Sequence, residues 1–380
     1  MIGEVLAGIL LGPSVLFWIN PDPGTDLGVV LGVLATLGIF FLSVAAGMEL
    51  GSEGLRQALK EGTYILAATE FIFPFALGYA LGQAMGLSFL TSLFLGTALS
   101  VTALPVSIRI FMDLNQLQTP LGRAVISVAM VNDILAFVLL GVVLQLNSSG
   151  ASLPAEGLAI GIGKVLVFVV LLFVVGRLIR YKAANGVPVL MTLSGKMRTP
   201  EAPFAIAVLL ALFLGAAAEL VGLHFVIGVF YASLLLTPET VGAGHLMRVQ
   251  NITRGVGFGF LAAIFFAVVG LKVSFAVTNW PLVIIVTALA FVGKIVGGLI
   301  GGALAGFRGR TLAALGVGLN ARGMMELVLA EIGLAAGIIG PDLYAALVLM
   351  TLITTLTTPL LLRVLLRIQW DAKPNAPQFE

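Results

Sequence analysis

The stretch GVGLNARG at residues 316–323 lies within an apolar run over residues 311–338 that is long enough to cross a membrane. Glycine weakens a helix, and Asn-Ala-Arg-Gly is an unusual string for a segment surrounded by lipid. The run over residues 88–112 is interrupted similarly by SVTALP at 100–105, where Pro105 removes a backbone donor and disfavours helical dihedrals at the preceding residue. Both runs are therefore predicted to form broken helices.

Charged residues make up only 10% of the 380 residues, whereas hydrophobic residues make up 59% and the mean hydropathy is +1.13. A soluble domain carries about 25% charged residues, so the expected surroundings of this chain are lipid. The chain has no cysteine, which excludes disulfides, thiol catalysis and zinc–thiolate sites. We expect no cofactor and no nucleic-acid partner.

Apolar runs of about 20 residues predict an all-α membrane protein with about twelve transmembrane helices. The predicted spans are residues 2–19, 27–48, 63–85, 88–112, 121–146, 156–180, 203–220, 222–237, 255–273, 281–305, 311–338 and 342–368. The two broken helices are the middle members of spans three to five and ten to twelve, an arrangement that indicates a transporter site. We predict two inverted repeats whose broken helices cross near the midplane; a proline kink and small-residue packing are the alternative.

The distribution of lysine and arginine predicts the orientation of the chain. An even number of spans places both termini on one side, and a cytoplasmic N-terminus puts most basic residues outside the spans on the cytoplasmic side. Only Lys164 and Lys272 then lie near the outer face. The sequence therefore predicts a multi-pass protein of the cell (inner) membrane with both termini in the cytoplasm.

Several charged residues lie within the predicted spans, although each charge at the bilayer centre costs about 3 kcal/mol on insertion scales. Asp133 is at the middle of the string AMVNDILAF. A carboxyl group in a low-dielectric environment can keep a proton near neutral pH, or release it and bind a dehydrated cation. Competition between a proton and a cation for one carboxyl group is sufficient for the exchange of these two ions. The alternative role for Asp133 is a structural ion pair with a basic residue. The charged residues within spans are Glu70, Asp133, Lys294, Arg322, Glu326 and Glu331.

Oxygen ligands for a monovalent cation are expected close to Asp133. The break in the span over residues 88–112 offers free carbonyl groups and the hydroxyls of Ser100 and Thr102. Asn132 offers an amide, whose alternative role is to bond to the neighbouring helix break. We predict that Na⁺ or K⁺ binds at Asp133.

Lys294 lies between glycines in the string FVGKIVGG, which permits close helix approach. A buried lysine pairs with an acid or loses its proton, unless its side chain reaches the membrane surface. We predict that Glu70 faces the core of spans four, five and ten, within about one water-bridged contact of Lys294 or Asp133. Arg322 and Glu326 are four residues apart and are predicted to pair locally, in a structural or a functional role.

Five motifs in this chain resemble those of monovalent cation:proton antiporter family 2, which includes Kef-, CHX- and NapA-like exchangers. The motifs occur in the order and spacing of the family and extend over nearly the whole chain. They are GEVLAGILLGP at 3–13, GTALSVTALPV at 96–106, VND at 131–133, GKIVGG at 293–298 and GLNARGMMEL at 318–327.

The resemblance implies a NhaA-type fold, a homodimer and an elevator-like movement in a single transmembrane exchanger domain over residues 1–380. The core ion-translocation bundle would comprise about residues 63–146 and 281–368, and the dimer or scaffold part about 1–48 and 156–273. Members usually have one more helix before GEVLAGILLGP. The soluble nucleotide-binding domain that follows the last span in Kef-type members is not expected in this chain.

The resemblance also implies roles for individual residues. Asp133 would be the aspartate that binds the cation or the proton. Asn132 occupies a position that is aspartate in electrogenic members and asparagine in electroneutral ones. Thr102 belongs to the crossing of the broken helices, and Lys294 is the lysine of span ten.

The sequence therefore predicts a secondary transporter, not an enzyme, that exchanges Na⁺ or K⁺ for H⁺ by alternating access. One carboxyl group exchanges one proton for one monovalent cation, so the exchange is predicted to be electroneutral. A sodium-coupled symporter of similar architecture and a cation channel are the alternatives. An intramembrane enzyme would need a nucleophile with a base, or metal ligands, at membrane depth.

Overall fold

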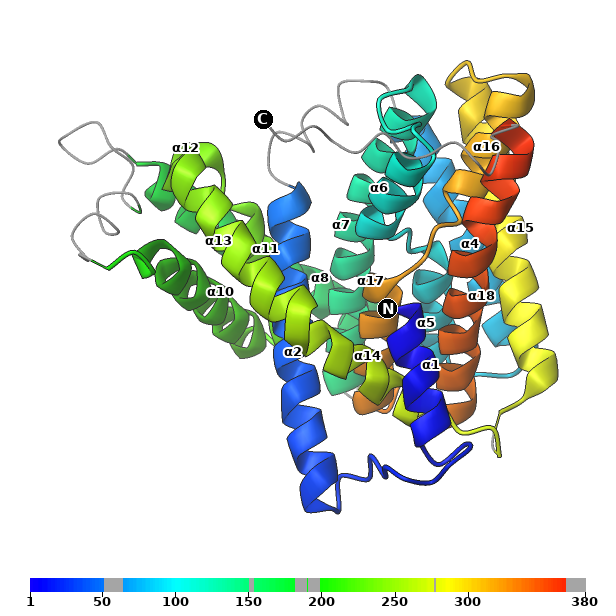
Figure 1. The fold of residues 1–380 in the computed structure, drawn as a ribbon, viewed down its shortest axis with the longest axis horizontal. Coiled ribbons are helices and arrows are strands. Elements are labelled where there is room, and N and C mark those ends of the chain that lie inside the picture. The colour runs from blue at the N-terminus through cyan, green and yellow to red at the C-terminus, as the bar shows by residue number, and fades with distance from the viewer. Residues whose placement is uncertain (51–63, 150–153, 182–189, 191–198, 277, 367–380) are drawn as a thin grey trace. The chain divides into compact units, whose positions relative to one another are not determined.

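The structure is a computed structural model that describes residues 1–380 except 51–63, 150–153, 182–189, 191–198, 277 and 367–380 (Figure 1). The described residues form α-helices, one short π-helix and connecting segments, and they contain no strand. This agrees with the all-α class that the apolar runs predict. Residue 63 and residues 367–368, at the ends of two predicted spans, lie outside the described part of the chain.

Eight helical stretches among the described residues are long and apolar enough to cross a membrane. Two shorter apolar helices, Ile2–Leu11 and Phe225–Leu234, coincide with other predicted spans. This is the pattern of a multi-pass membrane protein, whereas the number of twelve spans stays a prediction. The eight stretches are Asp26–Glu49, Tyr64–Ala84, Phe89–Asp113, Pro120–Asn147, Ala202–Leu220, Ala243–Leu271, Trp280–Leu304 and Pro341–Leu366.

The first predicted span, residues 2–19, is helical over only part of its length. Helix α1 (Ile2–Leu11) ends where Gly12 becomes extended and Pro13 follows, and turns come after them. Proline has no amide hydrogen and disfavours helical dihedrals in the residue before it. The prediction of a full-length helix in this range was therefore wrong.

The chain divides into two compact units. Unit 1 comprises Met1–Gly54 and Phe137–Ser274, and unit 2 comprises Leu55–Ala136 and Phe275–Glu380. Helix α7 (Pro120–Ser149) has residues in both units.

Unit 1 is built on close helix packing. Helix α1 approaches α14 at Gly8 and Gly270, where an added Cβ atom on either residue would collide with the backbone of the other helix. Helix α11 packs against α2 and α10 around an apolar cluster that includes Val44, Leu214 and Val229. The helices of unit 1, besides α1 and part of α7, are α2 (Asp26–Leu50), α8 (Pro154–Arg180), α10 (Ala202–Leu220), α11 (Phe225–Leu234), α12 (Pro238–Val241), α13 (Ala243–Val256), the π-helix η1 (Gly257–Leu261) and α14 (Ala262–Leu271).

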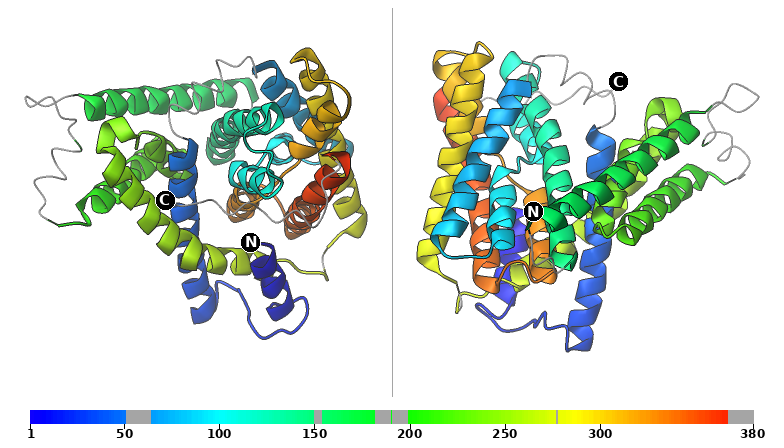
Figure 2. Two further views of the ribbon diagram at one scale, coloured as in Figure 1. Left: turned by 45° about the horizontal axis from the view of Figure 1, so that its top comes forward. Right: turned by 180° about the vertical axis from the view of Figure 1, so that it is seen from behind.

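Unit 2 contains both interrupted spans. Helix α4 packs against both α15 and α5, and α15 packs against α16 and α18 (Figures 1 and 2). An apolar cluster that includes Phe111, Val125 and Leu319 joins α6, α7 and the end of α16. Besides part of α7, the helices are α4 (Tyr64–Ala84), α5 (Phe89–Ser100), α6 (Leu104–Asp113), α15 (Trp280–Leu304), α16 (Gly309–Gly318), α17 (Met324–Ala335) and α18 (Pro341–Leu366).

The two predicted helix breaks are present and contact each other. Residues 101–103 separate α5 from α6, and residues 319–323 separate α16 from α17. The amide of Ala103 donates a hydrogen bond to the carbonyl oxygen of Ala321 at 2.9 Å. The hydroxyl of Thr102 lies 3.2 Å from the carbonyl oxygen of Leu319. The breaks therefore satisfy some of the backbone groups that a continuous helix would have paired internally.

Candidate functional site

Glu70 and Lys294 form a buried ion pair in unit 2. Glu70 lies on α4 and Lys294 on α15, and neither side chain is exposed. The helices approach closely because Gly297 has no side chain: a Cβ atom there would lie 2.7 Å from the carbonyl oxygen of Thr69 and 2.9 Å from Cα of Glu70. The pairing of Glu70 with Lys294 that the sequence predicts is observed.

The carboxylate of Glu70 also accepts two hydrogen bonds. Asn132 on α7 donates its side-chain amide, and Thr102 in the first break donates its hydroxyl to Oε1 at 2.9 Å. Lys294 Nζ donates in turn to Thr102 Oγ1 at 2.6 Å. One carboxylate therefore connects α4, α7, α15 and the first helix break.

Two buried cations satisfy the carbonyl groups at the C-terminus of α5. Lys294 donates to the carbonyl oxygen of Ser100. Arg322, from the second break, donates to the carbonyl oxygens of Ala98 at 3.1 Å and Leu99 at 2.6 Å. The last carbonyls of a helix lack partners within it and carry partial negative charge, which cations stabilise.

Arg322 also forms an ion pair with Glu326 on α17, as the spacing of four residues predicts. Both side chains are buried. The guanidinium therefore joins the end of α5 to the first turn of α17, a contact that sequence reasoning did not anticipate. Arginine is suited to this position because its planar group donates in several directions at once.

Asp133 is buried on α7, directly after Asn132, and is only 2% exposed. Adjacent residues on a helix project about 100° apart, so Asp133 and Asn132 present their side chains in different directions from the same turn. The sequence predicts that the cation and the proton share a site at this carboxyl group. Its depth in the fold meets the first physical requirement of that prediction.

The hydroxyls of the first break differ in their bonding. Thr102 is part of the network around Glu70. Ser100 Oγ instead donates to the carbonyl oxygens of Gly96 at 2.8 Å and Phe71 at 3.0 Å. Serine at the end of a helix commonly bonds back to the preceding turn in this way. Ser100 contributes its carbonyl oxygen to Lys294, whereas we predicted its hydroxyl as a ligand.

Two threonines of α18 support the second break and were missed by the sequence analysis. Thr355 Oγ1 lies 2.7 Å from the carbonyl oxygen of Arg322, and Thr358 Oγ1 lies 3.3 Å from that of Asn320. Both side chains are buried. The signal for them was the string TLITTLTT at residues 351–358, which is unusually rich in hydroxyl groups for a spanning helix.

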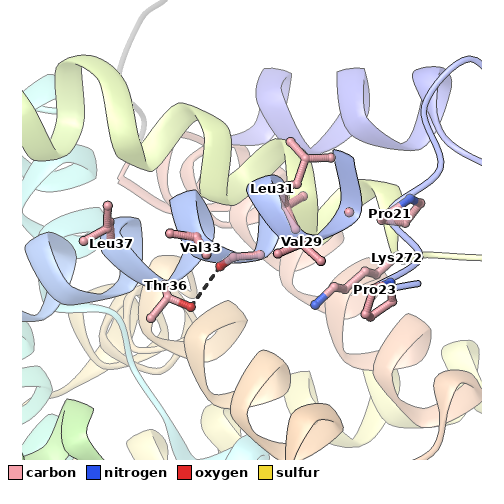
Figure 3. Close-up of a pocket in the computed structure, with 11 residues that line it drawn as sticks. Pro21, Pro23, Val29, Leu31, Val33, Thr36, Leu37 and Lys272 are labelled. Atoms are coloured by element: carbon pink, nitrogen blue, oxygen red, sulfur yellow. Dashed lines mark hydrogen bonds between the residues drawn. The ribbon is translucent and has the colours of Figure 1, made fainter. Parts of the chain in front are cut away.

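Unit 1 contains a cavity of about 450 Å³ along the first half of α2 (Figure 3). Its lining is apolar except for the hydroxyl of Thr36, which bonds to the carbonyl oxygen of Gly32, and the side chain of Lys272. No carboxyl group lines this cavity. Because the exchange that the sequence predicts needs a titratable acid, we place the candidate site among the buried charged residues of unit 2.

Two buried ion pairs, Glu70 with Lys294 and Arg322 with Glu326, lie at the helix breaks, and each contains one cation and one anion. Asp133 is a further buried carboxyl group, on α7 in the same unit. Within the described residues, no three His, Asp or Glu side chains come together as ligands for a resident metal ion.

The fold and the site define a multi-pass membrane protein in which two interrupted helices meet beside buried ion pairs. The sodium/hydrogen exchanger (transmembrane) family matches residues 1–367, and the chain belongs to this family. The membership confirms the resemblance that the motifs carry.

Curated relatives match over almost the whole chain. A Na⁺/H⁺ antiporter of Enterococcus hirae is 28% identical over 367 residues, which cover 96% of this chain and 90% of the relative. The Na⁺/H⁺ antiporter NhaS4 of Synechocystis is 30% identical, again covering 96% and 90%. Cation/H⁺ antiporter 18 of Arabidopsis thaliana is 32% identical, and the match covers 96% of this chain and 45% of that longer protein.

Among solved structures, the sodium proton antiporter MjNhaP1 of Methanocaldococcus jannaschii at pH 8 has a similar fold. The TM-score is 0.63, with 15% identity, and the match covers 95% of this chain and 89% of that one. At this identity the similarity concerns the fold alone.

Proposed function

We propose that this protein is a secondary antiporter that exchanges a monovalent cation, Na⁺ or K⁺, for H⁺, with Asp133 as the group that both ions share. Membership of the sodium/hydrogen exchanger family and the antiporter names of its relatives support exchange over symport, channel conduction or enzymatic chemistry. The observation that carries the proposal is the buried carboxyl group of Asp133 on α7, in the same unit as the two buried ion pairs at the helix breaks.

The mechanism follows from the charge of Asp133. Protonated Asp133 is neutral. When Asp133 releases its proton on one side of the membrane, its carboxylate has one negative charge, which is costly in lipid. Binding of one monovalent cation restores neutrality, so the loaded and the protonated states cross readily and the empty charged state does not.

We infer that oxygen atoms of Asn132 and Thr102 complete the cation site. Asn132 Oδ1 is buried and has no hydrogen-bond partner among the described residues, because the bond to Glu70 uses the amide nitrogen. Thr102 offers a hydroxyl oxygen in the first break. Monovalent cations are held by neutral oxygen atoms of this kind together with a carboxylate.

At the level of the chain, the two interrupted spans would be the crossing members of two inverted repeats. Unit 2 would be the core ion-translocation bundle and unit 1 the scaffold through which a homodimer forms, with an elevator-like movement between inward- and outward-open states. The protein would lie in the cell membrane with both termini in the cytoplasm, as the distribution of basic residues predicts.

The proposal is tested by Asp133→Asn in proteoliposomes with an imposed pH gradient. We expect the variant to fold and insert, because the substitution removes a buried charge, and to lose at least about 90% of cation-dependent proton flux, since amides do not titrate near neutral pH. Asp113→Asn is the matched control: Asp113 is half-exposed and pairs with Arg109 at the end of α6. Substantial exchange by folded Asp133→Asn would overturn the assignment.

A further inference from the structure

Asn320 has a buried side chain whose polar atoms have no protein partner. It lies in the second break, between α16 and α17, and its side chain is 0% exposed. Neither the amide oxygen nor the amide nitrogen forms a hydrogen bond with any described residue. Its backbone, by contrast, is satisfied: the amide donates to Val317 O at 3.0 Å, and the carbonyl accepts from Thr358.

The surroundings of Asn320 make this amide unusual. The flanking residues Leu319 and Ala321 belong to the apolar cluster of α6, α7 and α16. A buried amide without a hydrogen bond destabilises the fold, whereas leucine has nearly the same shape and carries no polar atoms. Packing alone therefore favours an apolar side chain at this position, and the amide needs another explanation.

The position of Asn320 supplies that explanation. Thr102 bonds to the carbonyl oxygen of Leu319, and the amide of Ala103 bonds to that of Ala321. Asn320 is the residue between these two bonds, so it is fixed where the breaks touch. Thr102 also belongs to the network of Glu70 and Lys294. The residue that carries the unsatisfied amide therefore lies in the backbone segment of the second break that contacts the first break.

We propose that the Asn320 side chain is a specificity-determining ligand of the transported monovalent cation, which it meets through its amide oxygen. This inference rests on the proposed antiport function. It assigns cation binding to a residue of the second break. The amide is neutral and does not titrate, so it contributes to cation affinity and selectivity while leaving the number of exchanged protons unchanged. Selectivity among cations depends on the number and placement of such oxygen ligands.

The test is Asn320→Leu, which removes the amide and retains the shape. In proteoliposomes with an imposed pH gradient, we expect the half-saturating cation concentration to rise roughly 5- to 10-fold, which corresponds to the loss of one oxygen ligand. We also expect the ratios among Li⁺, Na⁺ and K⁺ to change. If Asn320→Leu does not fold, the same measurements are made on Asn320→Ala, and we expect the same changes.

A second readout does not depend on transport. Cations that bind the folded protein raise its unfolding temperature, so titration of purified protein with LiCl, NaCl and KCl gives a midpoint for each ion, with choline chloride as the ionic-strength control. The midpoint of Asn320→Leu should move by the same factor as its half-saturating concentration. The matched control is Thr287→Val on α15, which removes a buried hydroxyl that likewise has no partner among the described residues and should leave both values unchanged.

The outcomes separate this inference from the function on which it rests. If the unsubstituted protein shows no exchange, the proposed function fails, and the unfolding midpoints still decide whether Asn320 is a ligand of a bound monovalent cation. Unchanged midpoints and unchanged selectivity in a folded Asn320→Leu variant overturn the inference, because the amide is then only an unsatisfied structural group. An equal change in Thr287→Val also overturns it, since any lost polar atom in unit 2 would then have that effect.

Discussion

Lys294 is bound to three groups that belong to different elements: the Glu70 carboxylate, the Thr102 hydroxyl and the Ser100 carbonyl. A lysine in this position cannot be replaced by an apolar residue without leaving several polar atoms unsatisfied. The same holds for Glu70, which accepts from three donors. The free energy of the pair therefore depends on both partners being present.

A double-mutant cycle on this pair is the prediction at the scale of the residue. Glu70→Gln should destabilise the detergent-solubilised protein by about 3–5 kcal/mol, because it leaves a buried ammonium group without its counter-ion. Lys294→Met in the same background should recover part of this loss, as measured by thermal unfolding.

The exposed pair of Arg109 and Asp113 is the control for this cycle, since surface ion pairs contribute little. Its double-mutant cycle should show almost no coupling. Losses that simply add in the Glu70→Gln/Lys294→Met protein would show that the two buried residues are not coupled.

The sequence carried much of this residue-level information, but not all of it. Charges are so costly in lipid that Glu70 and Lys294 were predicted partners once each had been placed within a span. That Arg322 bonds to Ala98 and Leu99 could not be predicted, because those contacts join carbonyl groups of an unremarkable apolar string to a residue more than 200 positions away. Main-chain acceptors have no signature in the sequence.

At the scale of the element, the packing of α15 on α4 decides whether the ion pair can form. Gly297 lies against the backbone of Thr69 and Glu70, one turn from Lys294 on the same helix. A methyl group at this position must push the two helices apart, since the atoms that it meets belong to the backbone and cannot rotate away.

Gly297→Ala should therefore destabilise the protein by about 1–3 kcal/mol and lower the rate of exchange, although alanine favours a helix more than glycine does. Gly32→Ala on α2 is the control, because an added Cβ atom there meets no neighbouring atom within 4 Å. Thermal unfolding and exchange are measured on both variants. Equal effects at the two positions would show that close packing at Gly297 is not needed.

Elements also show where sequence patterns are decisive and where they are not. Proline and glycine disfavour a continuous helix, so the interruptions after Ser100 and Gly318 occur within the strings in which the breaks were predicted. The same chemistry ends α1 at Leu11, where the apolar run continues and predicts more helix than is present. Hydropathy measures the surroundings of a segment, whereas backbone hydrogen bonding decides its conformation.

At the scale of the whole molecule, the proposed site predicts the number of charges that cross the membrane. With Asn132 before Asp133, α7 supplies one carboxyl group to the proposed site, so we expect one proton to replace one cation. Lys294 is the residue that could change this number, because a lysine that released its proton in every cycle would carry a second one. In this structure its amino group is held by Glu70, Thr102 and Ser100.

We therefore expect exchange to be electroneutral, and the test is its response to a membrane potential. A net movement of one charge would couple to the potential by about 2.3 kcal/mol per 100 mV, which shifts the equilibrium cation ratio roughly 50-fold. The potential is imposed with an ionophore for an ion that the protein does not carry, and the cation gradient that just balances a fixed pH gradient is measured. We expect this balancing gradient to be the same at 0 and at 100 mV of either sign, to within about 2-fold. A shift near 50-fold would mean that a second proton moves, and Lys294→Met would then have to abolish the shift if the lysine carries it.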